Sequence, residues 1–125
     1  MSDAAALFEG LARALREAAP EAVALPVQAQ ETRDGIPTCW VPAGAVRAAL
    51  RHFKEQVPRP FRMLYDLTAI DERWRKHRDG QPPADFTVVY LLFSFERNAW
   101  LRLKTALRGE TPSLPSATPV WRTAD

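Results

Sequence analysis

The sequence has few of the residues that build disulfides and metal centres. It contains one cysteine, Cys39, and two histidines, His52 and His77, in 125 residues. A single cysteine excludes an internal disulfide and a cysteine-ligated metal site within the chain, and suits a reducing compartment. The histidines are 25 residues apart, so we interpret them as surface side chains and expect no metal site. Cys39, beside Trp40, is expected to be a packed small side chain rather than a reactive thiolate.

Glycine-rich loops, long apolar runs and charge excess are also missing. The five glycines are scattered, and none forms a phosphate-binding fingerprint. No segment approaches the roughly 20 apolar residues of a membrane helix, and the N-terminus lacks the basic start of a signal peptide. We therefore expect a cytosolic chain with no membrane span of its own. Its 17 basic and 15 acidic residues are too balanced to predict a nucleic-acid-binding protein.

The most apolar stretch is residues 85–95, DFTVVYLLFSF. Its β-branched and aromatic composition, without Gly or Pro, predicts a strand. Alternate residues would form two faces, one with Phe86, Val88, Tyr90, Leu92 and Ser94 and the other with Thr87, Val89, Leu91, Phe93 and Phe95. Because both faces are largely apolar, the strand is expected inside a sheet that is covered on both sides.

Two amphipathic helices and a hairpin are predicted before this strand. The first helix begins at Asp3 and is closed by Pro20; the second begins near Pro42. Their apolar positions have helical spacing: Leu7, Phe8, Leu11 and Leu15 in the first, and Val46, Leu50, Phe53 and Val57 in the second. Between them, residues 23–27 and 36–41 are expected to pair as a hairpin through the Asp34–Gly35 turn.

Three strands without proline follow the second helix: residues 61–70, 85–95 and 100–107. In the first, Phe61, Met63, Tyr65 and Leu67 are expected on one side. In the last, Leu101, Leu103, Thr105 and Leu107 point inward and Arg102, Lys104 and Arg108 outward. The predicted fold is α+β, a mixed or antiparallel sheet of four to five strands, formed by the N-terminal hairpin and a three-stranded meander, with both helices packed on one face.

This arrangement leaves the second face of the sheet without a cover. Burying a Phe, Leu or Val side chain stabilises a fold by roughly 1.5 to 3 kcal/mol, and an exposed apolar patch is an aggregation hazard. Our hypothesis is that the second face docks onto another polypeptide or onto a further part of the same polypeptide outside these 125 residues.

The charged loop at residues 71–84, DERWRKHRDGQPPA, is long for a hairpin connection. Arg and Trp are favoured at protein interfaces, so Trp74, Arg75 and Arg78 are candidate partner contacts. The alternatives are a solvated loop and an RNA-binding patch with Tyr65, Tyr90 and Phe93 as stacking platforms. Against RNA, Asp71, Glu72 and Asp79 nearly neutralise the loop.

No catalytic constellation is expected. Asp66 and Asp71 are five residues apart at a strand end, a spacing that does not bring two carboxylates together. Asp66 is instead expected to accept hydrogen bonds from a neighbouring strand or loop. At the end of the chain, Ser116 or Thr118 before Pro119 predicts the start of a helix, on which Trp121 is a further candidate partner contact.

Several of these motifs together resemble the C subunit of respiratory NADH:quinone oxidoreductase, complex I. They are Leu64, Asp66, Leu67 and Asp71; the loop from Arg75 to Phe86; Val89, Tyr90, Leu92 and Ser94; and the segment from Pro115 to Ala124. Glu72–Arg73 and Arg97–Asn98 are closest to the form in which C is fused ahead of D. The family's acid-Arg-acid signature would follow just after Asp125, so residues 1–125 are expected to be one C-like domain truncated at its C-terminus.

The resemblance implies a structural and assembly role without catalytic residues. It places the domain in the hydrophilic arm, beside D-type, B-type and iron-sulfur subunits, on the cytoplasmic side of the bacterial inner membrane. No cofactor would bind this domain; NADH, FMN, iron-sulfur clusters and quinone serve the parent complex. Two alternatives stay open: the homologous component of a membrane-bound hydrogenase or formate hydrogenlyase, and a free-standing module that binds RNA or peptide.

Overall fold

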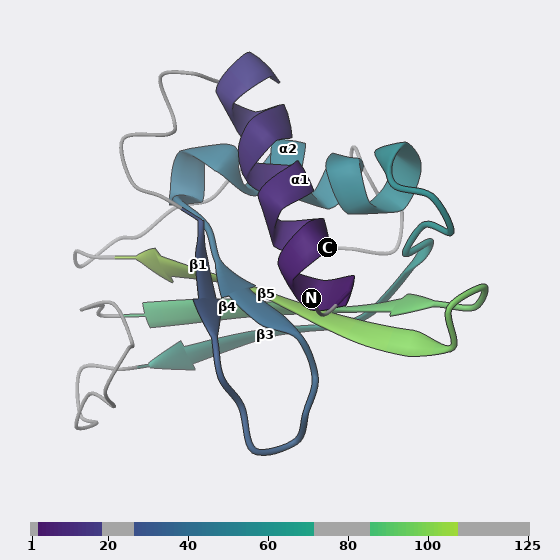
Figure 1. Cartoon of the computed structure of the whole chain (residues 1–125). Coiled ribbons are helices and arrows are strands. Elements are labelled where there is room, and N and C mark those ends of the chain that lie inside the picture. Colours follow the sequence, from purple (N-terminus) through teal and green to yellow (C-terminus); the bar gives the residue numbers. More distant parts are fainter. Residues whose placement is uncertain (1–2, 19–26, 72–85, 108–125) are drawn as a thin grey trace.

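The computed structural model describes residues 3–18, 27–71 and 86–107. They form a five-stranded sheet with two helical segments on one side of it (Figure 1). The predicted α+β class, with a mixed sheet and helices on one face, is confirmed. In the part of the chain that is described, no helix is long and apolar enough to cross a membrane.

Both predicted helices form. Helix α1 spans Asp3–Ala18. The second helical segment is a 3-10 turn, η2 (Ala43–Ala45), then α2 (Val46–Arg51) and a π-helical turn, η3 (His52–Gln56). The predicted apolar stripes face the sheet: Phe8, Leu11, Leu15, Val46, Leu50, Phe53 and Val57 are all buried. Helical spacing of apolar residues therefore predicted which sides of both helices enter the core.

The sheet has the order β1-β2-β5-β4-β3. Its strands are β1 (Gln28–Gln30), β2 (Thr38–Trp40), β3 (Met63–Asp71), β4 (Phe86–Ser94) and β5 (Ala99–Leu107). The pairs β3–β4 and β4–β5 are antiparallel, which confirms the meander, and β1–β2 is the antiparallel hairpin. The hairpin joins the meander by parallel pairing of β2 with β5. Strand β4 therefore has a neighbour on each side, as its composition predicted.

Most of the predicted first strand of the hairpin, residues 23–27, lies outside the described residues. Val27, which is described, is not part of a strand, and β1 forms at Gln28–Gln30. Apolar alternation does not mark β1, because it is an edge strand of two glutamines and an alanine. The Nε1 of Trp40 donates to Oε1 of Gln30 at 2.7 Å across the hairpin. The turn follows the prediction, with Gly35 at φ 74°, a conformation that favours glycine.

A β-bulge changes the predicted faces of β3. Leu64 pairs with Leu92 and Asp66 with Leu91, so Tyr65 is an extra residue on the bulged strand. The predicted common side for Met63, Tyr65 and Leu67 is therefore wrong. Met63 lies opposite Phe93 whereas Leu67 lies opposite Tyr90, and Phe93 and Tyr90 are on different faces of β4. Phe61, predicted to begin that strand, precedes it and is buried in the core.

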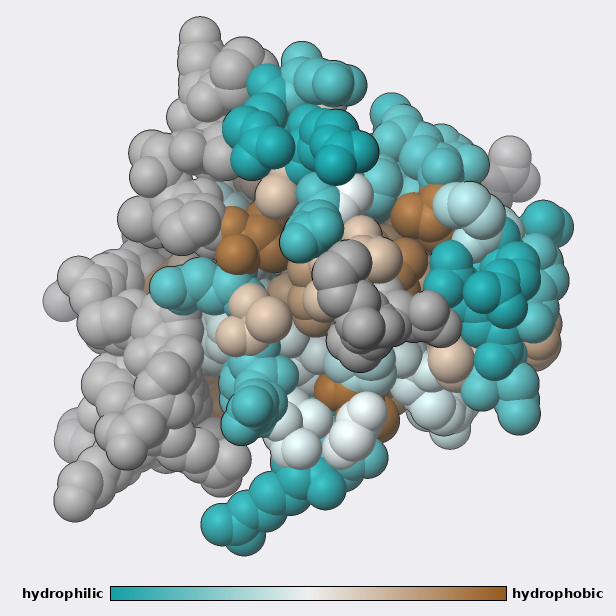
Figure 2. Space-filling view, viewed as in Figure 1, coloured by the Kyte–Doolittle hydropathy of each residue, from teal (hydrophilic) through white to brown (hydrophobic). Residues whose placement is uncertain are grey.

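One hydrophobic core lies between the helices and the sheet. The sheet contributes alternate residues: Cys39 from β2, Tyr90 and Leu92 from β4, and Leu101 and Leu103 from β5. Of the residues of β5 predicted to point inward, Leu101, Leu103 and Thr105 are buried and Leu107 is partly buried. In the view of Figure 2, hydrophobic residues reach the surface as small separate patches among hydrophilic ones. The described residues visible on this side therefore expose no large continuous apolar area (Figure 2).

Candidate interaction surface

Four aromatic side chains form a continuous cluster on the sheet face opposite the helices. The ring centroids of Tyr65 and Trp100 are 4.8 Å apart, those of Trp100 and Phe93 4.7 Å, and those of Phe93 and Phe95 5.0 Å. The outer two pairs meet edge to face and the middle pair is tilted. These geometries are favourable for aromatic pairs. We call Tyr65, Phe93, Phe95 and Trp100 the aromatic cluster.

Strand register and the bulge bring the cluster together. The four-residue turn after β4 sets Ser94 opposite Ala99, so Phe93 lies opposite Trp100. Tyr65 reaches Trp100 from the bulge on β3. The sequence placed Phe93 and Phe95 on this face but missed Trp100. The length of the turn after β4 could have indicated Trp100, because it fixes the register of β4 with β5.

The end of this face that carries the aromatic cluster is exposed. The exposed fractions are 67% for Phe95, 58% for Tyr65 and 38% for Met63. Both helical segments lie on the other side of the sheet (Figure 1). Taking a large apolar side chain from full exposure to full burial contributes roughly 1.5 to 3 kcal/mol, so covering these partly exposed side chains would gain a fraction of that amount each. A contiguous exposed apolar patch of this kind indicates an interaction site.

The other half of the same face is polar and held by side-chain contacts. Arg102 on β5 donates to Asp34 in the hairpin loop at 2.6 Å and to Oγ1 of Thr38 at 3.2 Å. The ammonium group of Lys104 lies 5.3 Å from the ring centroid of Trp40 and donates to Gln30. Both cations therefore already have partners within the chain.

The hairpin loop is fixed to β5 by an ionised carboxylate. The hydrogen bond from Arg102 holds the pKa of Asp34 well below its usual value, helped by the hydrogen bond from the Ile36 amide. Thr32 donates to the carbonyl of Ile36 at 3.0 Å, which closes the loop. The polar half of the face is thus ordered by its own contacts.

A second set of contacts supports the turn that carries Phe95. Ser94 and the Nε of Arg97 both donate to the carbonyl of Arg59, at 3.2 and 2.8 Å, and Arg97 also donates to the carbonyl of Pro58. Arg59 has φ 50°, in the left-handed region that non-glycine residues seldom adopt. Arg97 therefore ties the β4–β5 turn to the segment between η3 and β3.

The predicted site residues divide into those described and those not. Trp74, Arg75, Arg78 and Trp121, the candidate partner contacts, lie outside the described residues. Of the three predicted stacking platforms, Tyr65 and Phe93 belong to the aromatic cluster. Tyr90 does not, because it lies on the helix-covered face of β4, where it is buried and burial raises its pKa.

The register of β3 with β4 also shows where the two members of the candidate acidic pair, Asp66 and Asp71, lie. Asp66 lies opposite Leu91 and Asp71 opposite Phe86, so the two carboxylates are on different faces of the sheet. Asp66 accepts hydrogen bonds, as expected, but the donors are Leu67 and Thr68 of its own strand. The spacing argument against a paired acid and base therefore agrees with the structure.

Cys39 and His52 are both inside the fold. Burial raises the pKa of the Cys39 thiol, which is the state of a packed small side chain. His52 was expected at the surface, and that prediction is wrong: it is 8% exposed and contacts Phe53 edge to face. Burial lowers its pKa, while a contact from Nδ1 to Oε1 of Gln56 opposes this. Among the described residues no three His, Cys, Asp or Glu side chains are grouped as metal ligands would be.

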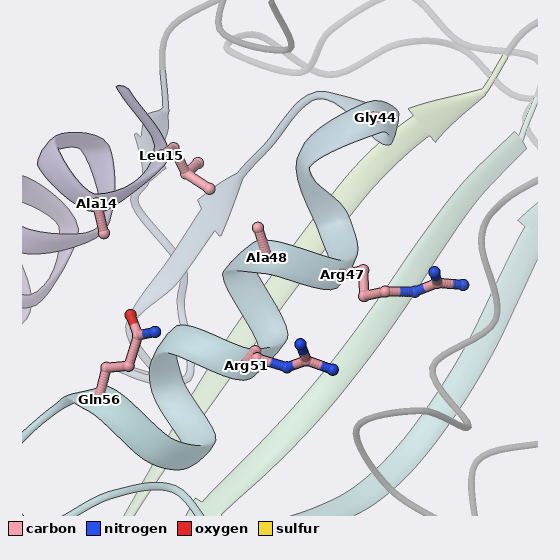
Figure 3. Close-up of a pocket in the computed structure, with 7 residues that line it drawn as sticks. All are labelled: Ala14, Leu15, Gly44, Arg47, Ala48, Arg51 and Gln56. Carbon is pink, nitrogen blue, oxygen red and sulfur yellow. The ribbon is translucent and has the colours of Figure 1, made fainter. Parts of the chain in front are cut away.

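A shallow groove of about 370 Å³ lies between α1 and the second helical segment (Figure 3). Small side chains such as Ala14 and Ala48 line it, together with Arg47 and Arg51. The two guanidinium groups extend in the same direction, away from Ala14 and Leu15 (Figure 3). Arg51 is 3.9 Å from Glu55, an exposed pair of small energetic value. The guanidinium groups do not converge on the groove as the polar groups of a ligand site would.

The chain is similar to proteins of one family. Residues 39–125 match the family described as the respiratory-chain NADH dehydrogenase 30 Kd subunit. That range contains all of β3 to β5, the second helical segment and the aromatic cluster.

Three relatives show the same similarity over 96 residues. The chain is 50% identical to the C/D subunit of the NADH-quinone oxidoreductase of Methylococcus capsulatus, of Acidiphilium cryptum and of Nitrosospira multiformis. In each case the match covers 77% of this chain and 16% of the relative. The chain thus matches only about 16% of the length of these curated relatives.

Proposed function

Because the chain belongs to the family of the 30 Kd subunit of respiratory-chain NADH dehydrogenase, we propose that it is a structural and assembly module of an NADH-quinone oxidoreductase. The resemblance to the C subunit in its form fused with D, drawn from the sequence motifs, is confirmed by the family match and by the names of the relatives. The proposed module corresponds to the C part of such a polypeptide.

In this role the domain carries no catalytic residues and binds no cofactor. NADH, FMN, iron-sulfur clusters and quinone would be held elsewhere in the complex, and the domain would support electron transfer from NADH to quinone by holding its neighbours in place. The proposed neighbours are D-type, B-type and iron-sulfur subunits of the hydrophilic arm. The proposed location is the cytoplasmic side of the bacterial inner membrane, as a peripheral part of a membrane complex.

The observation that carries this proposal is the aromatic cluster. Aromatic side chains are enriched at the centres of protein interfaces, where they fill pockets of the partner. Here Tyr65 and Phe95 are exposed while Phe93 and Trp100 pack behind them. Such a surface is better explained by a protein neighbour than by solvent.

The test is assembly of the complete complex in the native bacterium. Tyr65→Ser with Phe95→Ser should reduce the amount of intact complex at least severalfold. The amount is read from native gel electrophoresis of the membranes and from their NADH:quinone oxidoreductase activity, each relative to total membrane protein. The matched control is Glu9→Ser with Arg13→Ser, two exposed residues of α1 on the other side of the sheet. Assembly equal to wild type for the aromatic variant, with the chain incorporated, would refute the proposed interface.

The charged loop offers a second test of the same role. Trp74→Ala should weaken assembly of the arm and leave the melting temperature of the isolated chain unchanged. Loss of folding would instead assign Trp74 to the stability of the domain.

A free-standing module that binds RNA or peptide is the second candidate, because the aromatic cluster shares a sheet face with Arg102 and Lys104. Those two cations already contact Asp34, Gln30 and Trp40, which disfavours phosphate binding. Salt-dependent binding of single-stranded RNA by the isolated chain would favour this candidate. For the hydrogenase alternative, the names of the relatives favour the quinone oxidoreductase instead.

A further inference from the structure

The outer edge of β3 is a surface at which another strand could pair. Strand β3 ends the sheet, and β4 is its only strand neighbour among the described residues. It is nine residues long, and seven of them are exposed. Long exposed edge strands are templates for strand addition and aggregation, and folded proteins protect them by specific devices. A second copy of the same chain has an identical edge, with the same exposed apolar residues on β3.

The side-chain carboxylate of Asp66 binds hydrogen-bond donors of this edge strand. Its Oδ1 accepts the amide of Leu67 at 2.9 Å and its Oδ2 accepts the hydroxyl of Thr68 at 3.2 Å. Both contacts are exposed to solvent. Since β4 lies on the inner side, an amide taken by an exposed carboxylate points to the outer side of the strand. The donor that an incoming strand would need is therefore already used.

The bulge at Tyr65 adds to this protection. It lies directly before Asp66, between Leu64 and the next paired residue. Bulges bend a strand and increase its twist, which impairs straight pairing with a further strand. The two devices occupy adjacent positions in the first half of β3.

We propose that Asp66 closes the outer edge of β3 against antiparallel pairing with β3 of a second copy of this chain. This inference is independent of the proposed role in the oxidoreductase. In a symmetric pair centred on Leu67, the two Leu67 residues would exchange amide and carbonyl hydrogen bonds, and Tyr65 would face Ala69 of the other copy. The Leu67 amide must leave Asp66 for this pairing to form.

Electrostatic repulsion also opposes this pairing of two β3 strands. In that register each Asp66 faces Thr68 of the other copy, and the two Asp66 carboxylates are diagonal neighbours on one face. Diagonal side chains in antiparallel strands are roughly 7–8 Å apart, close enough for like charges to repel. Asp66 thus acts twice, by occupying the amide and by placing two negative charges together.

Self-association of the full 125-residue chain tests the proposal. Sedimentation equilibrium should give at least a tenfold lower dimer dissociation constant for Asp66→Ala than for wild type. Asp66→Asn keeps an oxygen for the Leu67 amide but loses the charge, and should lie between them. Glu55→Ala, which removes an exposed negative charge outside β3, should match wild type. An unchanged constant for Asp66→Ala, or an equal increase in association for Glu55→Ala, would overturn the assignment.

Hydrogen exchange separates edge pairing from association through the aromatic cluster. In the Asp66→Ala dimer the amides of Leu67 and Ala69 should become protected, because both would bond across the new interface. Adding Ala69→Pro removes one of these donors and should restore the wild-type constant, since proline is tolerated at a strand edge. If that double variant does not fold, the exchange result decides alone: fast exchange at Leu67 in a tighter dimer would refute edge pairing.

Discussion

The two faces of β4 have nearly the same composition but different surroundings. On one face Tyr90 and Leu92 are 2% and 0% exposed beneath the helices, and on the other Phe93 is half-buried and leads to Phe95, which is 67% exposed. Hydrophobic pattern alone therefore does not say whether a neighbour belongs to the same polypeptide. It says that a neighbour is needed. The helices meet that need on one face, and the proposed partner subunits meet it on the other.

The largest expected difference between the faces is in core stability. Leu92→Ala should lower the free energy of unfolding by about 2–5 kcal/mol, because it leaves a cavity under the helices. Leu91→Ala, one residue earlier and on the open face, should lower it by roughly 1 kcal/mol or less. Urea unfolding of both variants gives their free energies of unfolding and compares the same Leu-to-Ala change on the two faces. Equal losses would show that the open face is as well packed as the covered one.

The next effect concerns the turn that presents Phe95. Arg97→Ala should destabilise the chain by roughly 1–2 kcal/mol, since hydrogen bonds from a charged group are worth more than neutral ones and Arg97 holds the carbonyls of Pro58 and Arg59. Arg62→Ala serves as the control, because it removes an exposed ion pair with Glu96 at 3.1 Å. Such pairs contribute about 0–1 kcal/mol. A larger loss for Arg62 than for Arg97 would contradict this assignment.

As the pH is lowered, the first loss of stability should come from the helix-covered side of the sheet. Burial sets the folded-state pKa of His52 below its ordinary value of 6.5, so the unfolded chain binds more protons and stability falls as the pH drops through 6.5. The urea midpoint should therefore decrease as the pH is lowered from above that value to below it. His52→Phe should remove most of that slope. A slope of the same size in His52→Phe would assign it to another group.

The polar half of the open face should respond at lower pH. The contact with Arg102 sets the folded-state pKa of Asp34 below its ordinary value of 3.8. Its stabilisation is present above that value and is lost as the pH falls through and below it. Asp34→Asn should reduce the loss of stability in this acid range and leave the change caused by His52 intact. An altered response in the His52 range would show that the two regions are coupled.

The smallest stability effect is expected at the most exposed ring. Phe95→Ser should change the free energy of unfolding of the isolated chain by no more than about 0.5 kcal/mol. The same variant should impair assembly of the complex. A fold that collapses without Phe95 would mean that the aromatic cluster stabilises the domain rather than a contact with a neighbour.

Local patterns in the sequence predicted most of the fold. Apolar spacing located both helices and the faces they bury, and the proline-free run located the three strands of the meander. The Asp34–Gly35 pair located the hairpin turn. These features depend on neighbours in the sequence, so the sequence displays them directly.

The features that escaped prediction depend on contacts between distant residues. The bulge at Tyr65 and the parallel pairing of β2 with β5 leave no local signature. Burial of His52 depends on packing around the π-helical turn. For the interaction surface, alternation identified Phe93 and Phe95, whereas Trp100 required the register of β4 with β5. The candidate contacts Trp74, Arg75, Arg78 and Trp121 remain predictions.

Pairing of β2 with β5 has a consequence for synthesis of the protein. The amide of Val41 donates to the carbonyl of Lys104 at 2.9 Å, and Thr105 donates to the carbonyl of Val41 at 2.8 Å. A nascent chain that has emerged only as far as β4 lacks these partners, so its early hairpin has no place to dock. Completion of the domain must await the last strand, and contacts of such long range slow folding. During translation, β2 and the apolar sides of the helices are then most exposed to chaperones and proteases.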